Sequence, residues 1–145
     1  MFILTLISHP IEALVYLLAL VLSITFHEFA HAWTAYKRGD DTPYLMGRVT
    51  LNPMAHLDPL GSVMFLVLGF GWGKPVMYNP MRLQHRRDEL MIALAGPISN
   101  ILLGVIILLL ATTLTALGID LINPMFLYVI AYVNILLAAF NMLPI

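Results

Sequence analysis

Cysteine is missing from the 145 residues, and charged side chains account for only 10% of them. Without cysteine the chain forms no disulfide and offers neither a thiolate metal ligand nor a thiol nucleophile. Soluble domains carry about 25% charged residues, so this shortage of charge argues against an ordinary soluble enzyme. The formal net charge of −1 also gives no reason to expect nucleic acid as a partner.

Hydrophobic residues take the place of the missing charges and make up 61% of the chain. At this length we expect a single domain, residues 1–145. A small globule leaves a large fraction of its surface exposed, so it cannot hide this much apolar surface from water. The composition therefore predicts a membrane protein.

Long stretches without charge indicate where the chain crosses the membrane. No charged residue occurs from Leu90 to Ile119 or from Leu121 to Ile145, and Ile11 to Tyr36 reads as one long helix. Each stretch exceeds the roughly 20 residues that a helix needs to cross about 30 Å of hydrocarbon. The shorter uncharged segment Pro59 to Gly73 ends in a glycine-rich stretch and suits a re-entrant or amphipathic helix. The predicted fold is an all-α membrane protein with three transmembrane helices and one short dip.

Two short stretches between the first and second spans differ from the rest. Tyr44 to Pro53 and Lys74 to Pro80 contain β-branched and aromatic residues together with proline. This composition is typical of short edge strands. We therefore expect a small membrane-associated β element beside the helices.

The basic residues all lie between the first and second long spans. Because cytoplasmic loops carry the excess of lysine and arginine, this central segment is predicted to be cytoplasmic, with the N-terminus outside and the C-terminus inside. We therefore expect a multi-pass protein of the cell membrane whose first and third spans end at the same face. The basic residues are Lys37, Arg38, Arg48, Lys74, Arg82, Arg86 and Arg87.

The first span carries the pattern H-E-x-x-H, from His27 to His31. Residues four apart on a helix lie about 40° apart around its axis, so both imidazoles can reach one zinc ion. Glu28 lies beside them and can take a proton from a metal-bound water. The alternative is a chance pattern within a structural polar cluster. Since a charged group at the centre of a span costs about 2.5–3.5 kcal/mol even on a lenient scale, we favour the metal site.

Asparagines in the other two spans are further candidates, each with a structural alternative. Asn100 ends the segment Ala95–Asn100, whose small residues are also typical of plain helix packing. Asn141 is followed by Pro144, a pattern that also fits a helix stop signal. The remaining histidines are expected at interfacial or solvated positions: His9, His56 and His85.

With these residues the chain resembles the site-2 proteases, a family of intramembrane zinc metalloproteases. Besides H-E-x-x-H, the similarity rests on Gly47–Pro53 with Asp58-Pro59, on Gly73–Val76 and on Ala95–Asn100. These segments resemble those of small bacterial members that lack an added PDZ or CBS domain.

The resemblance implies zinc as the cofactor, with His27 and His31 as ligands and Glu28 as the general base. It implies that Asn141 and Asn100 support the substrate or the oxyanion, Asn100 as the polar residue packed near the site.

The partners implied by the resemblance are the lipid bilayer and a membrane-protein substrate. The surface stretches Gly47–Asn52 and Lys74–Met77 resemble the β elements of the family. They are expected to pair with an unwound substrate by strand addition.

In that family the third zinc ligand is an aspartate in an L-D-G segment, a few residues after the asparagine that Asn141 resembles. The sequence stops at Ile145, before such a segment. Catalytic zinc normally has three protein ligands, so we expect a metalloprotease core truncated before L-D-G, either a fragment or a shortened form with weakened metal binding. Other acidic residues do not match the family position: Asp58, Asp88, Glu89 and Asp120.

The leading hypothesis is therefore an intramembrane zinc metalloprotease that hydrolyses peptide bonds in or near transmembrane segments, with its active site toward the cytoplasmic half of the bilayer. One alternative is a membrane protein that handles haem or metal, although two histidines four apart on one helix cannot bind opposite faces of a haem. Another is a non-catalytic relative that lacks the third ligand and binds membrane helices. The sequence indicates no oligomeric state.

Overall fold

Six α-helices follow one another in the computed structural model, which describes residues 2–69, 71–119 and 123–143. Three of them, α2, α5 and α6, are long and apolar enough to cross a membrane, as the uncharged stretches predict. The helices are α1 (Phe2–Ser8), α2 (Pro10–Lys37), α3 (Thr42–Leu45), α4 (Pro59–Leu68), α5 (Arg86–Ala116) and α6 (Pro124–Asn141), with 3-10 turns η1 (Pro53–Ala55) and η2 (Pro80–Arg82).

Asparagine or aspartate followed by proline begins several of these elements. Each capping side chain accepts a hydrogen bond from a backbone N–H two or three residues further on. Proline follows at the first helical position, where a backbone N–H has no partner within the helix. The starts of η1, α4, η2 and α6 are thus written in the sequence as Asn52-Pro53, Asp58-Pro59, Asn79-Pro80 and Asn123-Pro124.

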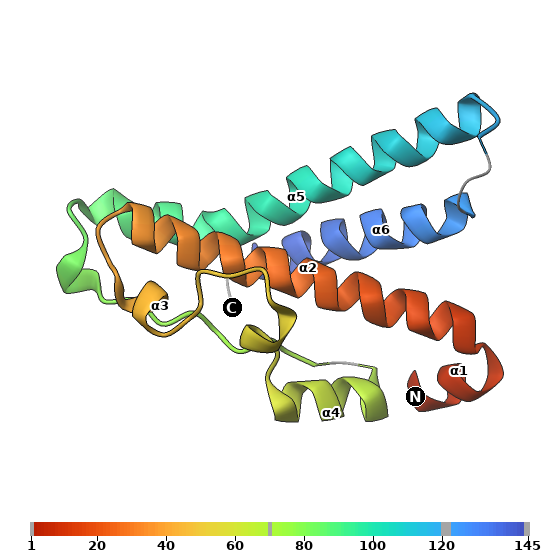
Figure 1. Ribbon diagram of the computed structural model, residues 1–145, viewed down its shortest axis with the longest axis horizontal. Helices are drawn as coiled ribbons and strands as arrows, with labels where there is room; N and C mark the ends of the chain where they lie inside the picture. Colours follow the sequence, from red (N-terminus) through yellow and green to blue (C-terminus); the bar gives the residue numbers. More distant parts are fainter. Residues whose placement is uncertain (1, 70, 120–122, 144–145) are drawn as a thin grey trace.

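The three long helices lie against one another and form the bundle (Figure 1). Many of their large apolar side chains point outward, among them Leu102, Ile106 and Leu109, which are 58%, 61% and 61% exposed. In water such a surface would be unfavourable, whereas a hydrocarbon solvent accepts it. The bundle is therefore that of a membrane protein, and its few buried polar groups lie between the helices.

The α4 segment returns toward the place where it starts. The helix ends at Gly69, whose φ of 79° is the left-handed conformation that favours glycine. The returning chain packs closely on the helix, because a Cβ at Gly61 would lie 2.2 Å from the Trp72 carbonyl oxygen. Leu57 and Gly73, on either side of the excursion, form an isolated antiparallel bridge. This path matches the predicted dip, whereas its depth in a membrane stays a prediction.

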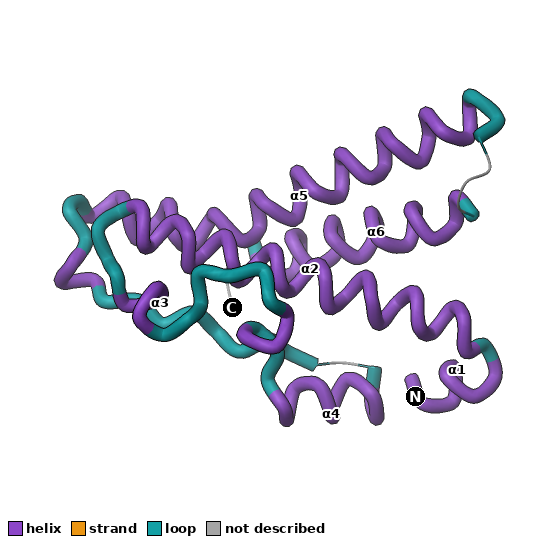
Figure 2. The backbone as a smooth tube through the Cα atoms, viewed as in Figure 1, coloured by secondary structure: helices purple, strands orange, loops and turns teal. Residues whose placement is uncertain are grey.

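The predicted β element is wrong for the described residues, which contain helices and loops but no strand (Figure 2). The prolines of Tyr44–Pro53 and Lys74–Pro80 lack the N–H that hydrogen bonds between strands need. The first two residues of Tyr44–Pro53 belong to α3. A side chain joins the two regions instead, since the Arg48 guanidinium donates to the carbonyl oxygens of Ala55 and Lys74.

Asp40 fastens the loop after α2 to the loop before α5. Its completely buried carboxylate accepts hydrogen bonds from the backbone N–H and hydroxyl of Thr42 at 3.0 and 2.6 Å and from the backbone N–H of Asn79 at 2.6 Å. Burial alone would raise the pKa of Asp40, but these hydrogen bonds and the charge of Arg82 outweigh it and lower that pKa. We call Asp40, Thr42 and Asn79 the Asp40 clasp.

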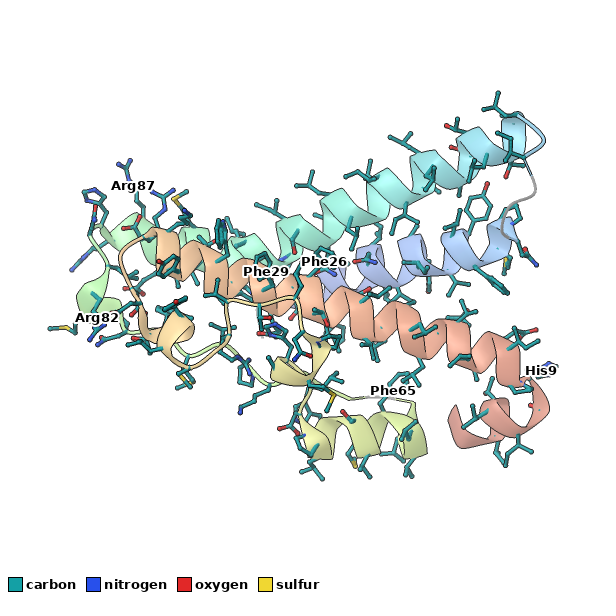
Figure 3. All side chains as sticks on the ribbon, in the orientation of Figure 1. His9, Phe26, Phe29, Phe65, Arg82 and Arg87 are labelled. Carbon is teal, nitrogen blue, oxygen red and sulfur yellow. The ribbon has the colours of Figure 1, made fainter. Side chains whose placement is uncertain are left out.

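The two ends of the bundle differ in charge. Arg82 and Arg87 lie at one end of the molecule and His9 lies at the other (Figure 3). The Asp40 clasp lies at the end that carries the arginines, because Asp41, the residue after Asp40, pairs with Arg82. The end that carries these arginines, here called the basic end, is thus built from loops that are fastened together.

Candidate metal centre

His27 and His31 point their Nε2 atoms at each other from adjacent turns of α2. The two nitrogens are 3.0 Å apart, and the ring centroids are 4.6 Å apart with the rings edge to face. His27 is buried and His31 is half-buried. The H-E-x-x-H spacing thus brings the two imidazoles together as predicted.

The other ring nitrogen of each histidine is held by an oxygen of α5. Asn100 Oδ1 lies 2.7 Å from His27 Nδ1, and the Ile92 carbonyl oxygen lies 2.6 Å from His31 Nδ1. Since neither oxygen can donate, each neutral imidazole carries its proton on Nδ1. The two Nε2 atoms therefore face each other as lone pairs with no proton between them.

Gly96 leaves the space that the two imidazoles occupy. A Cβ at this position would lie 2.3 Å from His31 Nε2 and 2.6 Å from His27 Nε2. Any side chain would therefore displace one of the two nitrogens. Gly96 is part of the candidate metal centre, and helix packing alone does not account for it.

This donor set fits a metal ion shared by two neutral imidazoles. Zinc–nitrogen bonds of about 2.0–2.1 Å can meet across the 3.0 Å that separates the Nε2 atoms. In the part of the chain that the structure describes, no three histidine or acidic side chains are grouped to hold a metal. A third ligand from an L-D-G aspartate stays a prediction.

Other acidic side chains have structural partners of their own. Asp58 caps α4 by accepting a hydrogen bond from the Gly61 backbone N–H at 2.8 Å. Asp88 is buried at the start of α5 and lies 3.7 Å from the Arg38 guanidinium. Asp120 lies outside the described residues. Asp58 and Asp88 therefore serve the fold.

Glu28 lines a cavity of about 370 Å³ together with His27 and Asn141. The backbone N–H of Val76 donates to its carboxylate, and the charge of Arg48 attracts it. Helix α6 thus brings Asn141 to the same cavity as the H-E-x-x-H helix. The predicted convergence of the first and third spans is observed.

An apolar cavity of about 280 Å³ lies between α2 and α4, next to the first one. Four residues belong to the walls of both: Leu20, Ile24, Gly71 and Trp72. The carboxylate and the imidazole thus have an apolar neighbouring space on the side of the dip.

The two candidate asparagines have different surroundings. Asn141 is exposed, and its Nδ2 donates to the Leu137 carbonyl oxygen at 2.8 Å. Asn100 is completely buried and contacts His27 directly. Its packing near the site follows the resemblance, whereas support of a substrate or oxyanion by either asparagine stays a prediction.

Some polar residues near the site escape sequence reasoning. The expectation of an interfacial or solvated His56 is wrong, because the side chain is completely buried and its Nε2–H donates to the Thr50 carbonyl oxygen at 2.7 Å. Burial lowers the pKa of His56, which keeps the ring neutral.

Two further polar residues were not singled out from the sequence. Arg48 is buried, and Asn134 contacts Asn100 from α6. For Asn134 a signal exists, since a polar residue within an uncharged span is usually functional or hydrogen-bonded.

Comparison with known proteins identifies the family of the chain. The model of peptidase family M50 matches residues 15–121, which include both histidines, Glu28, Gly96 and Asn100. The chain belongs to this family. The resemblance to the site-2 proteases is thereby confirmed, and the histidine pair lies within the matched part of an M50 protein.

The relatives of this M50 protein carry names that refer to zinc. The chain is 38% identical to the "putative zinc metalloprotease YwhC" of Bacillus subtilis over 94% of its own length and 66% of that protein's length. It is 33% identical to the "putative zinc metalloprotease Rip2" of Mycolicibacterium smegmatis over 61% of its own length and 36% of that protein's length. The chain thus spans just under two thirds of one relative and about a third of the other. No solved structure matches it.

Proposed function

We propose that the chain forms the catalytic core of a zinc metalloprotease that hydrolyses peptide bonds in or near membrane-spanning segments. The observation that carries this proposal is the pair of Nε2 atoms 3.0 Å apart, whose Nδ1 partners are both oxygens of α5, with Glu28 in the adjoining cavity. The family and the names of the relatives support a zinc-dependent peptidase. The position of the pair on a helix long and apolar enough to cross a membrane supports a substrate within the bilayer.

In this proposal His27 and His31 hold zinc together with a third ligand outside the described residues. When bound, zinc supplies a Lewis acid that polarises the scissile carbonyl and acidifies a water molecule. The Glu28 carboxylate accepts a proton from the attacking water and delivers it to the leaving amine. Asn141 donates from the cavity wall to the substrate backbone or to the oxyanion.

The proposed substrate is a membrane protein whose spanning segment unwinds near the cavity. The stretch Lys74–Met77 runs beside Glu28, since Val76 contacts its carboxylate, so the unwound segment would pass along this stretch to reach the carboxylate. The apolar cavity between α2 and α4 suits a hydrophobic side chain of that segment. By the distribution of basic residues, cleavage takes place in the cytoplasmic half of the membrane.

The proposed base is tested by Glu28→Gln in the full-length protein, reconstituted in liposomes with a membrane-anchored substrate. Glutamine keeps the shape of the side chain but cannot take the proton, so cleavage should fall by about 10²–10⁴-fold while zinc content is unchanged. Glu12→Gln, near the opposite end of α2, is the matched control and should cleave normally. Undiminished cleavage by Glu28→Gln would contradict the base.

Zinc content of the purified protein tests the metal directly. We expect zinc to be retained and haem absorbance to be missing. A protein that retains no zinc at micromolar concentration and captures membrane helices without turnover would replace the proposal by the non-catalytic alternative.

A further inference from the structure

Asn134 is a completely buried amide in α6 and does not line the cavity that contains Glu28. Its Oδ1 accepts a hydrogen bond from Asn100 Nδ2 at 2.9 Å, and its Nδ2 donates to the Ile130 carbonyl oxygen at 2.9 Å. A buried amide in an apolar span is tolerated only when it is hydrogen-bonded. The hydrogen bond to Asn100 connects Asn134 to the candidate metal centre.

The side-chain amide of Asn100 is held in one of its two orientations. Its Nδ2 donates to the Ser23 carbonyl oxygen at 3.2 Å and to Asn134 Oδ1 at 2.9 Å. In the reversed orientation the amide oxygen would face two oxygens, and the amide nitrogen would face His27. The hydrogen bonds on the side of Ser23 and Asn134 therefore turn Asn100 Oδ1 toward His27 Nδ1, at 2.7 Å.

The side-chain amide of Asn134 is also held in one orientation, by the Ile130 carbonyl oxygen. The Ile130 carbonyl oxygen can only accept, so it requires the Nδ2 group of Asn134. This leaves Oδ1 of Asn134 for Asn100. A single set of donor and acceptor assignments thus leads from a backbone carbonyl of α6, through Asn134 and Asn100, to the proton on His27 Nδ1.

We propose that Asn134 is a positioning residue that acts through Asn100 to hold His27 in the tautomer whose Nε2 is free to bind a metal ion. The effect on metal binding rests on the proposed function, whereas the tautomer is a property of the metal-free protein. Residues that orient a metal-binding histidine through hydrogen bonds typically change metal affinity by about 10–100-fold when they are replaced.

The rival explanation is that Asn134 only ties α6 to α5. Asn134→Leu separates the two, because leucine has a similar size but no acceptor for Asn100. Asn134→Asp keeps an oxygen for Asn100 and, as the protonated acid, an O–H that can donate to the Ile130 carbonyl oxygen. Thr25→Val is the matched control, since Thr25 is buried in the same bundle and its hydroxyl bonds only to Val21 of its own helix.

Metal affinity is measured for Zn²⁺ by competition with a chelator in detergent, together with thermal unfolding. Asn134→Leu should lower the affinity about 10–100-fold, Asn134→Asp should keep most of it, and Thr25→Val should leave it unchanged. In the background of Asn100→Leu, the change at Asn134 should cause no further loss, because the connection to His27 is already broken. If Asn134→Leu does not fold, the smaller Asn134→Ala takes its place.

Nitrogen-15 NMR of the metal-free, histidine-labelled protein gives a second readout. His27 should carry its proton on Nδ1 in the wild type. In Asn134→Leu only the 3.2 Å hydrogen bond to Ser23 still orients Asn100, so the second tautomer of His27 should become detectable. Wild-type affinity and an unchanged tautomer in Asn134→Leu, or additive losses from the two asparagine changes, would overturn the proposal. A wild type that binds no zinc but shows the tautomer change would contradict the proposed function and leave the positioning role intact.

Discussion

Gly96 is the residue of α5 that decides how closely this helix approaches the two imidazoles. Gly96→Ala places a Cβ 2.3 Å from His31 Nε2 and 2.6 Å from His27 Nε2, so the two nitrogens must move apart or away from α5. We expect metal affinity to fall by at least ~10-fold, even though alanine is better than glycine in a helix by about 1 kcal/mol. Chelator competition on the purified variant measures the loss.

Gly104→Ala is the control on the same face of α5. Its added Cβ would meet the Ile135 side chain at 2.8 Å, which changes the contact between α5 and α6 but touches neither histidine. Metal affinity should fall less in this variant than in Gly96→Ala, because the added Cβ does not displace the imidazole nitrogens. The assignment of Gly96 to the metal centre fails if both alanine variants bind metal alike.

Single residues of the site were predictable where their spacing alone carries the chemistry. The pair His27 and His31 is recognisable because four residues return a helix to the same face. Gly96 and Asn100 fit two explanations in the sequence, since small residues and amides serve helix packing as well as a site. Only the approach of α5 to α2 separates these explanations, through contacts such as His27 with Asn100, which are 73 positions apart.

Among the elements, the loops at the basic end depend on the Asp40 clasp. Asp40→Asn weakens hydrogen bonds from Thr42 and Asn79 to a buried carboxylate. We expect the free energy of unfolding at neutral pH to fall by about 1–3 kcal/mol. Unfolding in detergent measures the difference, and Asp41→Asn is the matched control. Because Asp41 is about half exposed and, among the described residues, pairs only with Arg82, its change should cost at most about 1 kcal/mol.

The contribution of Asp40 should depend on pH in a defined direction. Its pKa is lowered in the folded protein, so the stabilisation is present above the pKa of the unfolded chain, about 3.9. It is lost as the pH falls through the lower pKa of the folded state. The difference between wild type and Asp40→Asn should therefore shrink in acid. A difference that stays constant down to about pH 2 would show that the carboxylate charge is not involved.

The elements could be predicted where length and apolar content suffice, and this holds for α2, α5, α6 and α4. The β element could not, because β-branched residues between prolines fit an edge strand and an irregular loop equally well. The structure contains the irregular loop, in which the Arg48 side chain holds the two regions together by donating hydrogen bonds to carbonyl oxygens. Such a contact between distant segments leaves no periodic trace in the sequence.

For the whole molecule, the orientation in the membrane is predicted from the basic residues. The absence of native cysteine allows single cysteines to be labelled without background. Ser8→Cys and Leu117→Cys should react with a membrane-impermeant maleimide on intact cells. Arg87→Cys should react only after the cells are opened, because positively charged loops stay in the cytoplasm. The reverse pattern of labelling would contradict the predicted orientation.

The long-range contacts of the candidate metal centre also indicate when, during synthesis of the chain, its hydrogen bonds can form. The His27–Asn100 hydrogen bond joins residues 73 positions apart, a distance that synthesis at about 5–20 residues per second covers in roughly 4–15 s. During that interval neither imidazole yet has its hydrogen-bond partner on α5. Asn134 follows Asn100 by 34 positions, so the nascent protein acquires its orienting hydrogen bonds one helix at a time. In the proposed function, metal binding by the fully oriented histidine pair would therefore come late in synthesis, after the third long helix has been made.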